Sequence, residues 1–143
     1  MSNWAHVNGS VRIDSIRGLD ENSDEVNEKI KKAFGEICRF EDDDFVTILP
    51  CGSEGSLEYT IWDNPSKSSV AAFTVNIFGD LRDYDDTYYI IEWFKKAVSD
   101  FTIRSAVLEI FNQDGTIVIS HSQESDIIGE DLITIKKFKI FKY

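Results

Sequence analysis

The sequence predicts an α+β domain in which two helices cover one face of an antiparallel sheet. Three observations support this prediction: several segments alternate apolar and polar residues, two segments repeat apolar residues at helical spacing, and an Asp-Gly pair joins two of the alternating segments. The chain has 143 residues, 42% of them apolar, which suits one domain with its own core. We therefore expect residues 1–143 to form a single domain.

The first strand is predicted from His6 to Ile16, where apolar and polar residues alternate. A helix is predicted over residues 24–38, because apolar residues recur there every three or four positions and Asn22 with Glu25 has the form of a capping box. Gly35 weakens this helix and could end it early.

A hairpin is predicted next. Residues 55–62 and 69–80 both alternate, and the turn-forming composition of residues 63–67 separates them. A second helix then begins after residues 80–86, with Asp85 or Asp86 as its N-cap. Its apolar stripe comprises Ile90, Trp93, Phe94, Ala97 and Phe101.

The C-terminal part is predicted to be β-structure. Residues 105–112 and 116–122 alternate on either side of a turn at 113–115 that contains Asp-Gly. Residues 132–143 form the last strand, whose alternation slips at Lys136-Lys137 and indicates a bulge. Its lysines are typical of a strand at a sheet edge, where they oppose pairing with other chains.

The first six elements have the order strand, helix, strand, strand, helix, strand. This order is that of the ferredoxin-like βαββαβ unit, to which the C-terminal strands are additions. We expect the first and third strands to run parallel, so that the loops 17–22 and 79–86 lie at one end of the sheet.

The charge of the chain is strongly negative and unevenly distributed. The formal net charge is -11, and residues 41–100 hold 13 acidic and 4 basic side chains. This balance argues against direct binding to nucleic-acid phosphates, which requires Lys and Arg. It favours a partner protein with a basic surface.

The sequence lacks a recognisable catalytic or metal-binding motif. Cys38 and Cys51 have no zinc-finger spacing, and we expect two reduced thiols that are mostly buried. His6 and His121 are expected on neighbouring strands, and in this they resemble the pair of two-histidine phosphoesterases. Neither His6-Val7-Asn8 nor His121-Ser122-Gln123 has the His-x-Thr or His-x-Ser form that those enzymes require. We therefore expect no catalytic residue, no metal and no cofactor.

Two acidic clusters remain as candidate contact sites. The first lies before the second helix and carries Tyr84, which we expect to be exposed, with Tyr88 as a further candidate. The second follows the first helix. Aromatic anchors surrounded by charge are typical of recognition surfaces. The candidate residues are Asp80, Asp83, Tyr84, Asp85 and Asp86, with Asp42, Asp43 and Asp44 as a second site.

The opening Asn3-Trp4, followed by a strand, resembles the start of some small phage-encoded proteins with a ferredoxin-like domain. The usual Cys after the Trp is Ala5 in this chain. The resemblance implies a phage or mobile-element origin. Many phage proteins of this size and acidity look like inhibitors that occupy the basic nucleic-acid-binding surfaces of host defence proteins.

These observations favour a non-enzymatic binding protein that blocks a basic surface of a host protein in the host cytosol. The N-terminus has no secretory pattern, and no apolar run approaches the length of a membrane span. The first alternative is a small-ligand or nucleotide-binding module that uses Trp62 and Phe73 on the open sheet face and could form a homodimer. The second is a phosphodiesterase that uses His6 and His121.

Overall fold

A computed structural model of the chain describes residues 2–14, 23–36, 48–63, 71–84, 86–128 and 131–143. The predicted α+β class is confirmed: these residues form two helices and an open antiparallel sheet of six strands in the order β2-β3-β1-β4-β5-β6. The elements in chain order are β1 (Trp4–Asp14), α1 (Ser23–Phe34), β2 (Glu58–Asp63), β3 (Ala71–Arg82), α2 (Thr87–Val98), β4 (Ile103–Asn112), β5 (Gly115–Ile128) and β6 (Asp131–Lys142).

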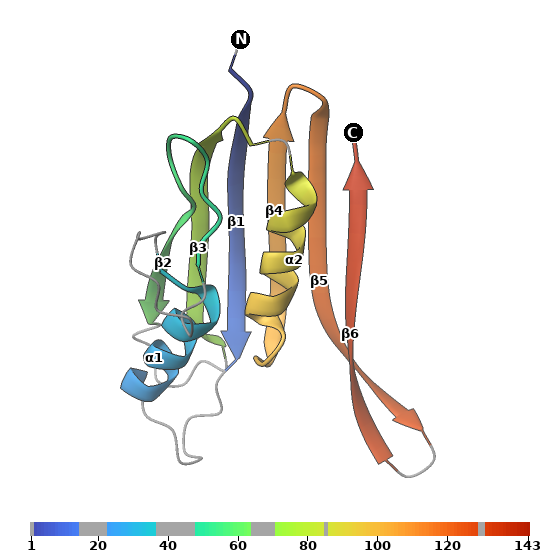
Figure 1. The fold of residues 1–143 in the computed structure, drawn as a ribbon. Helices are drawn as coiled ribbons and strands as arrows, with labels where there is room; N and C mark the ends of the chain where they lie inside the picture. Colours follow the sequence, from blue (N-terminus) through green and yellow to red (C-terminus); the bar gives the residue numbers. More distant parts are fainter. Residues whose placement is uncertain (1, 15–22, 37–47, 64–70, 85, 129–130) are drawn as a thin grey trace.

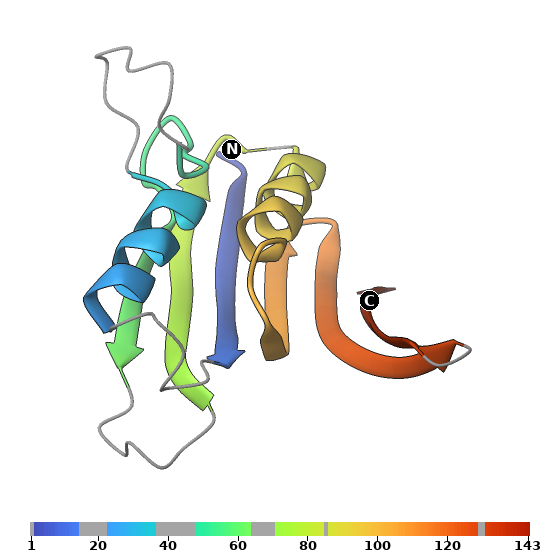
Figure 2. The same ribbon diagram turned by 90° about the horizontal axis from the view of Figure 1, so that it is seen from below.

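Both helices lie on the same face of the sheet, and no element of the described part of the chain covers the opposite face, here called the uncovered face (Figures 1 and 2). The alternation in β1 explains this arrangement, because Ala5, Val7, Val11 and Ile13 are buried under the helices. The large side chains Phe34 of α1 and Phe94 of α2 are fully buried and join the same cluster. The core therefore lies between the helices and one side of the sheet.

The first helix ends earlier than its apolar pattern predicts. α1 stops at Phe34, and Gly35 follows with a φ of 97°. Glycine adopts this left-handed conformation without the steric cost of a Cβ. The Gly35 N–H donates to the Lys31 carbonyl at 2.9 Å, which closes the last turn. Cys38 lies outside the described residues.

The expected parallel alignment of the first and third strands is wrong. β1 and β3 are antiparallel, with Trp4 opposite Arg82 and Asp14 opposite Ala71. The reason is the connection: one crossover through α1 precedes β2, and the hairpin from β2 to β3 then reverses the chain. The loops after β1 and β3 therefore start at opposite ends of the sheet.

The C-terminal hairpin is longer and more regular than its sequence pattern indicates. β5 continues through the polar stretch to Ile128, and β6 pairs with it without interruption. The bulge expected at Lys136-Lys137 is absent, because Lys136 faces Gln123 and Lys137 faces Ser122 in an unbroken register. β6 is an edge strand, as its lysines predict.

No helix in the described part of the chain is both long and apolar enough to cross a membrane.

Candidate functional site

One end of the sheet brings together most of the described candidate residues. The start of β1, the end of β3 and the start of α2 meet there (Figure 1). Asp80 lies in β3, Asp83 and Tyr84 follow β3, and Asp86 precedes α2. Asp85 and the second cluster of Asp42, Asp43 and Asp44 lie outside the described residues.

Asp80 is an exposed carboxylate that is paired with a histidine. Its Oδ1 lies 2.5 Å from Nδ1 of His6, which is directly opposite it on β1. The imidazole also stacks on the Phe111 ring of β4, with 6.1 Å between the ring centroids. The alternation of β1 and β3 could have predicted that both residues face away from the helices, but it does not reveal their pairing.

Asp83 has a positive φ of 52°, which is uncommon outside glycine. Its backbone N–H donates to the carbonyl of Asn3, and its Oδ2 accepts from the Ser53 hydroxyl at 2.8 Å. Asn3 therefore contacts the acidic segment directly, although the two are far apart in sequence. The Asp83 carboxylate stays about half exposed.

Arg82 is the basic residue at the centre of these acids. Its Nη1 lies 2.6 Å from Oε1 of Glu54, and its Nε lies 3.7 Å from Oδ2 of Asp83. All three side chains are at least a third exposed. Exposed ion pairs of this kind contribute at most about 1 kcal/mol, so they can be exchanged for contacts with a partner.

The turn from Cys51 to Ser56 brings Glu54 to this end of the sheet. Its backbone pairs with Arg82: the Ser53 N–H donates to the Arg82 carbonyl at 2.9 Å, and the Arg82 N–H donates to the Glu54 carbonyl at 2.9 Å. A Cβ on Gly55, whose φ is 74°, would collide with the Asp80 carbonyl. The glycines of this turn therefore permit a close approach of two backbones.

Tyr84 is not the exposed anchor that the sequence predicts. Its side chain is half-buried against the core, and this burial raises the pKa of its hydroxyl above the ordinary value. The negative charge of Asp86 and the neighbouring Tyr89 act in the same direction. The exposed aromatics at this end include Tyr88 and Tyr89 in the first turn of α2, with exposed fractions of 66% and 52%.

Asp86 caps α2, as predicted. Its Oδ1 accepts a hydrogen bond from the Tyr89 N–H at 3.2 Å. The carboxylate also favours the positive end of the helix dipole. Asp86 therefore has a structural role that Asp80 and Asp83 do not share.

The two histidines do not share a site. His6 is exposed on the uncovered face, whereas His121 is 2% exposed and lies on the helix side of β5, where its ring is 4.4 Å from that of Phe138. Their partners on β4 are Phe111 and Ala106, which belong to opposite faces. This separation argues against the phosphodiesterase alternative. In the described part of the chain, no group of three potential metal ligands is present.

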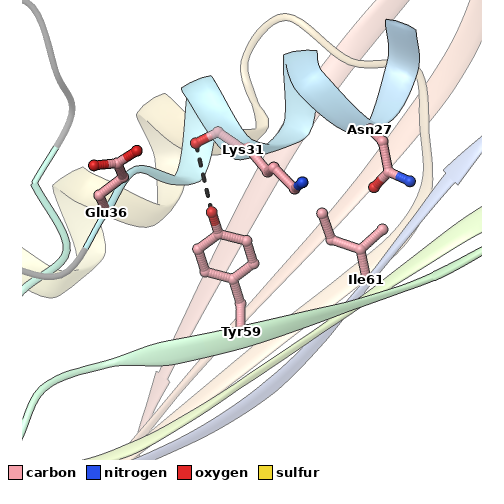
Figure 3. A pocket seen from close by; sticks show the side chains of 5 residues that line it. All are labelled: Asn27, Lys31, Glu36, Tyr59 and Ile61. Atoms are coloured by element: carbon pink, nitrogen blue, oxygen red, sulfur yellow. Dashed lines mark hydrogen bonds between the residues drawn. The ribbon is translucent and has the colours of Figure 1, made fainter. Parts of the chain in front are cut away.

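A separate cavity of about 460 Å³ opens between α1 and β2 (Figure 3). The Tyr59 hydroxyl lies beneath the end of α1 and donates to the Gly35 carbonyl at 2.8 Å. Burial and the negative charge of Glu36 raise the pKa of Tyr59. The cavity is lined by Asn27, Lys31, Glu36, Tyr59 and Ile61.

The ligand surface expected on the open face needs one correction. Trp62 is exposed there, but Phe73 is 2% exposed and belongs to the core. The alternation of β3 allowed either assignment, and the packing of the helices decides it.

No family model, curated protein or solved structure matches this chain.

Proposed function

We propose that this is a non-enzymatic binding protein that docks one end of its sheet onto a basic surface of a partner protein. The docking surface, here called the acidic end, comprises Glu54, Asp80, Asp83, Tyr88 and Tyr89. The observation that carries the proposal is the exposure of these three carboxylates at the same end of the sheet where α2 begins with two exposed tyrosines.

Each part of the acidic end suits protein recognition. The carboxylates outnumber the nearby Arg82, so they retain negative charge for an approaching basic surface. Tyr88 and Tyr89 supply large, amphipathic contact area with few rotatable bonds, which is the composition of interface hot spots. The Lys and Arg side chains of a surface that binds phosphates also form charged hydrogen bonds with carboxylates.

We also propose that β1 to β4 and the two helices form a ferredoxin-like unit of a phage or mobile-element protein. The strand order β2-β3-β1-β4, with both helices on one face, supports this fold. Asn3, half of the motif that resembles phage proteins, contacts Asp83. A host defence protein that binds nucleic acid, met in the host cytosol, is the partner class that this origin favours.

A charge-position experiment tests the proposal. The variant Glu54→Gln, Asp80→Asn, Asp83→Asn removes three charges from the acidic end, and Asp24→Asn, Glu28→Gln, Asp100→Asn removes three exposed charges elsewhere. Binding to a fluorescent nona-arginine peptide at low salt serves as the assay. We expect the first variant to lose about tenfold in affinity and the second less than twofold, since each lost ion contact is worth on the order of 0.5 kcal/mol.

Equal losses in the two variants would show that only net charge matters, and they would refute the acidic end as a docking site. An unchanged melting temperature in both variants verifies that the fold is intact. A second peptide with the same charge but lysine in place of arginine tests whether planar guanidinium groups are preferred.

A second candidate function is small-ligand binding, and the cavity between α1 and β2 favours it. Lys31 offers an ammonium group, and Glu36 offers a carboxylate on the other side of Tyr59 (Figure 3). This pair suits a zwitterion such as a free amino acid. A rise in melting temperature with amino acids or nucleotides, abolished by Lys31→Met, would support this function. No rise with any of these compounds would exclude it.

A further inference from the structure

The uncovered face of the sheet carries most of the exposed large apolar side chains in the described part of the chain. The register places residues from five strands on this face, because directly opposite residues of antiparallel pairs share a side. Between 36% and 51% of each side chain is exposed. These residues, here called the open-face patch, are Trp4, Trp62, Phe78, Val107, Phe111 and Phe141.

Single exposed apolar residues need no explanation. Six of them share this face, interspersed with polar residues such as His6, Asn8 and Ser120, and this mixed composition is typical of an interface that forms and dissociates. The helices bury the other face, so this face has no partner within the described part of the chain (Figure 2).

The charges on this face identify the kind of partner. Among the described side chains, the acidic residues on this face are Glu58, Glu109 and Asp80, the last of which also belongs to the acidic end, and the basic residues are Arg12, Arg82 and Lys139. The described side chains of this face are therefore balanced in charge, although the chain as a whole carries a net charge of -11. This face offers no excess of charge to attract a nucleic acid or a strongly basic protein. It is compatible with a surface on which acidic and basic residues are also balanced.

The area is that of a stable interface. Six strands about 4.8 Å apart, with roughly eight residues each at about 3.3 Å per residue, give a face of roughly 750 Å². A standard protein interface buries about 800 Å² on each partner. Two such faces packed against each other would therefore bury about the area of a standard protein interface.

We infer that the partner is a second copy of this chain, which packs its open face against the same face. Two-fold interfaces need a surface that is complementary to itself. A two-fold axis that lies between the two sheets, parallel to the strands and midway between β1 and β4, meets this need. It places His6 opposite Phe111 of the second copy, and Phe78 opposite Val118 of the second copy. It also sets Asn8 over Glu109 of the second copy, so no acid near the axis faces another acid.

Sedimentation equilibrium of the full chain tests the homodimer. We expect a mass twice the 16.4 kDa of one chain at high micromolar concentration, and dissociation on dilution. Phe78→Lys with Val107→Lys should produce the monomer at every concentration. The matched control Tyr88→Lys, which changes an exposed aromatic on α2, should leave the dimer intact.

Tryptophan emission provides a second readout. Trp93 is buried within each chain, whereas Trp4 and Trp62 lie on the open face. In a Trp93→Phe background, dilution should shift the emission to the red and increase acrylamide quenching as the interface opens. The same dilution of the Phe78→Lys, Val107→Lys protein should change neither property.

Three outcomes would overturn the inference. One is a monomer at all concentrations and salt levels, and another is a dimer that persists in the Phe78→Lys, Val107→Lys variant. The third is quenching of Trp4 and Trp62 by an oligothymidylate while the protein is monomeric, which would assign the face to single-stranded nucleic acid.

Discussion

Removing the side chains that cap the end of α1 should destabilise the protein by an amount that the structure allows us to estimate. The last carbonyls of a helix have no partners within it. Here the Phe34 carbonyl accepts from the Trp93 indole N–H at 3.0 Å, and the Gly35 carbonyl accepts from the Tyr59 hydroxyl at 2.8 Å. The two bonds join α1 to α2 and to β2, so each variant measures one of these connections.

Tyr59→Phe removes one neutral hydrogen bond from a partly buried site and keeps the ring, so we expect the free energy of unfolding to fall by about 1 kcal/mol. Trp93→Phe leaves the buried Phe34 carbonyl unsatisfied and also removes ring volume near the Phe34 side chain, whose centroid is 5.8 Å away. The expected loss is about 2–4 kcal/mol. For a chain of this size, each lost kcal/mol lowers the melting temperature by about 3 °C.

Urea unfolding followed by far-UV circular dichroism suits this comparison, because fluorescence changes when Trp93 is replaced. Tyr88→Phe is the matched control, since Tyr88 is 66% exposed and its change should stay within about 0.5 kcal/mol. If Trp93→Phe cost no more than Tyr88→Phe, water would be satisfying the Phe34 carbonyl and the reasoning would fail. The double variant should cost less than the two single losses together, since the helix end frays after either change.

Three further predictions concern residues that adjoin the acidic end in sequence. The folded-state pKa of Tyr84 is raised, so this residue stabilises the fold below pH ~10 and the stabilisation is lost as pH rises further. Alkaline unfolding of Tyr84→Phe should therefore have its midpoint at a higher pH than that of the wild type. An unchanged midpoint would contradict this reasoning. Asp86→Ala should lower the free energy of unfolding by about 1 kcal/mol through loss of the N-cap, whereas Asp86→Asn should retain most of it; equal losses would show that charge, not capping, matters. Gly55→Ala should destabilise the protein by at least about 1 kcal/mol, measured by urea unfolding, because the new Cβ meets the Asp80 carbonyl; a neutral effect would show that the turn can move away.

The helices and their buried faces could be predicted from the sequence because their signals are local. The stripe of Ile90, Trp93, Phe94 and Ala97 is buried as its spacing indicates. Asp86 caps α2 for the same reason, since an N-cap depends on residues three positions apart. Helical periodicity and N-capping were therefore predicted correctly, because both depend only on residues that are close in sequence.

Relations between distant segments could not be predicted in this way. The alternation of β1 and β3 identifies their faces but contains nothing about their relative direction, which the connections determine. The approach of Glu54 to Arg82 depends on a turn 28 positions earlier in the chain. Tyr84 belongs to no periodic segment, so no pattern indicated that its ring would pack against the core.

The excess of acidic residues in 41–100 overstates the negative charge that is available for binding, because several of these residues have partners within the chain. His6 pairs with Asp80, Arg82 lies beside Asp83, and Asp86 is used by α2. The sequence counts formal charge, whereas binding depends on the charge that a partner can reach. The acidic end is therefore a smaller surface than the sequence predicts, and Glu54 belongs to it although the sequence did not single it out.

The two proposed interfaces should respond to salt in opposite directions. Docking of the acidic end onto a basic partner brings unlike charges together, so added salt screens the attraction and weakens binding. Homodimerisation joins two balanced faces while the remainder of each chain, at a net charge of -11, repels its counterpart, so added salt should strengthen it. Titrating sodium chloride while measuring peptide binding and sedimentation on the same preparation separates the two. Weakening of the dimer by salt would mean that charge pairs, rather than the open-face patch, hold it together.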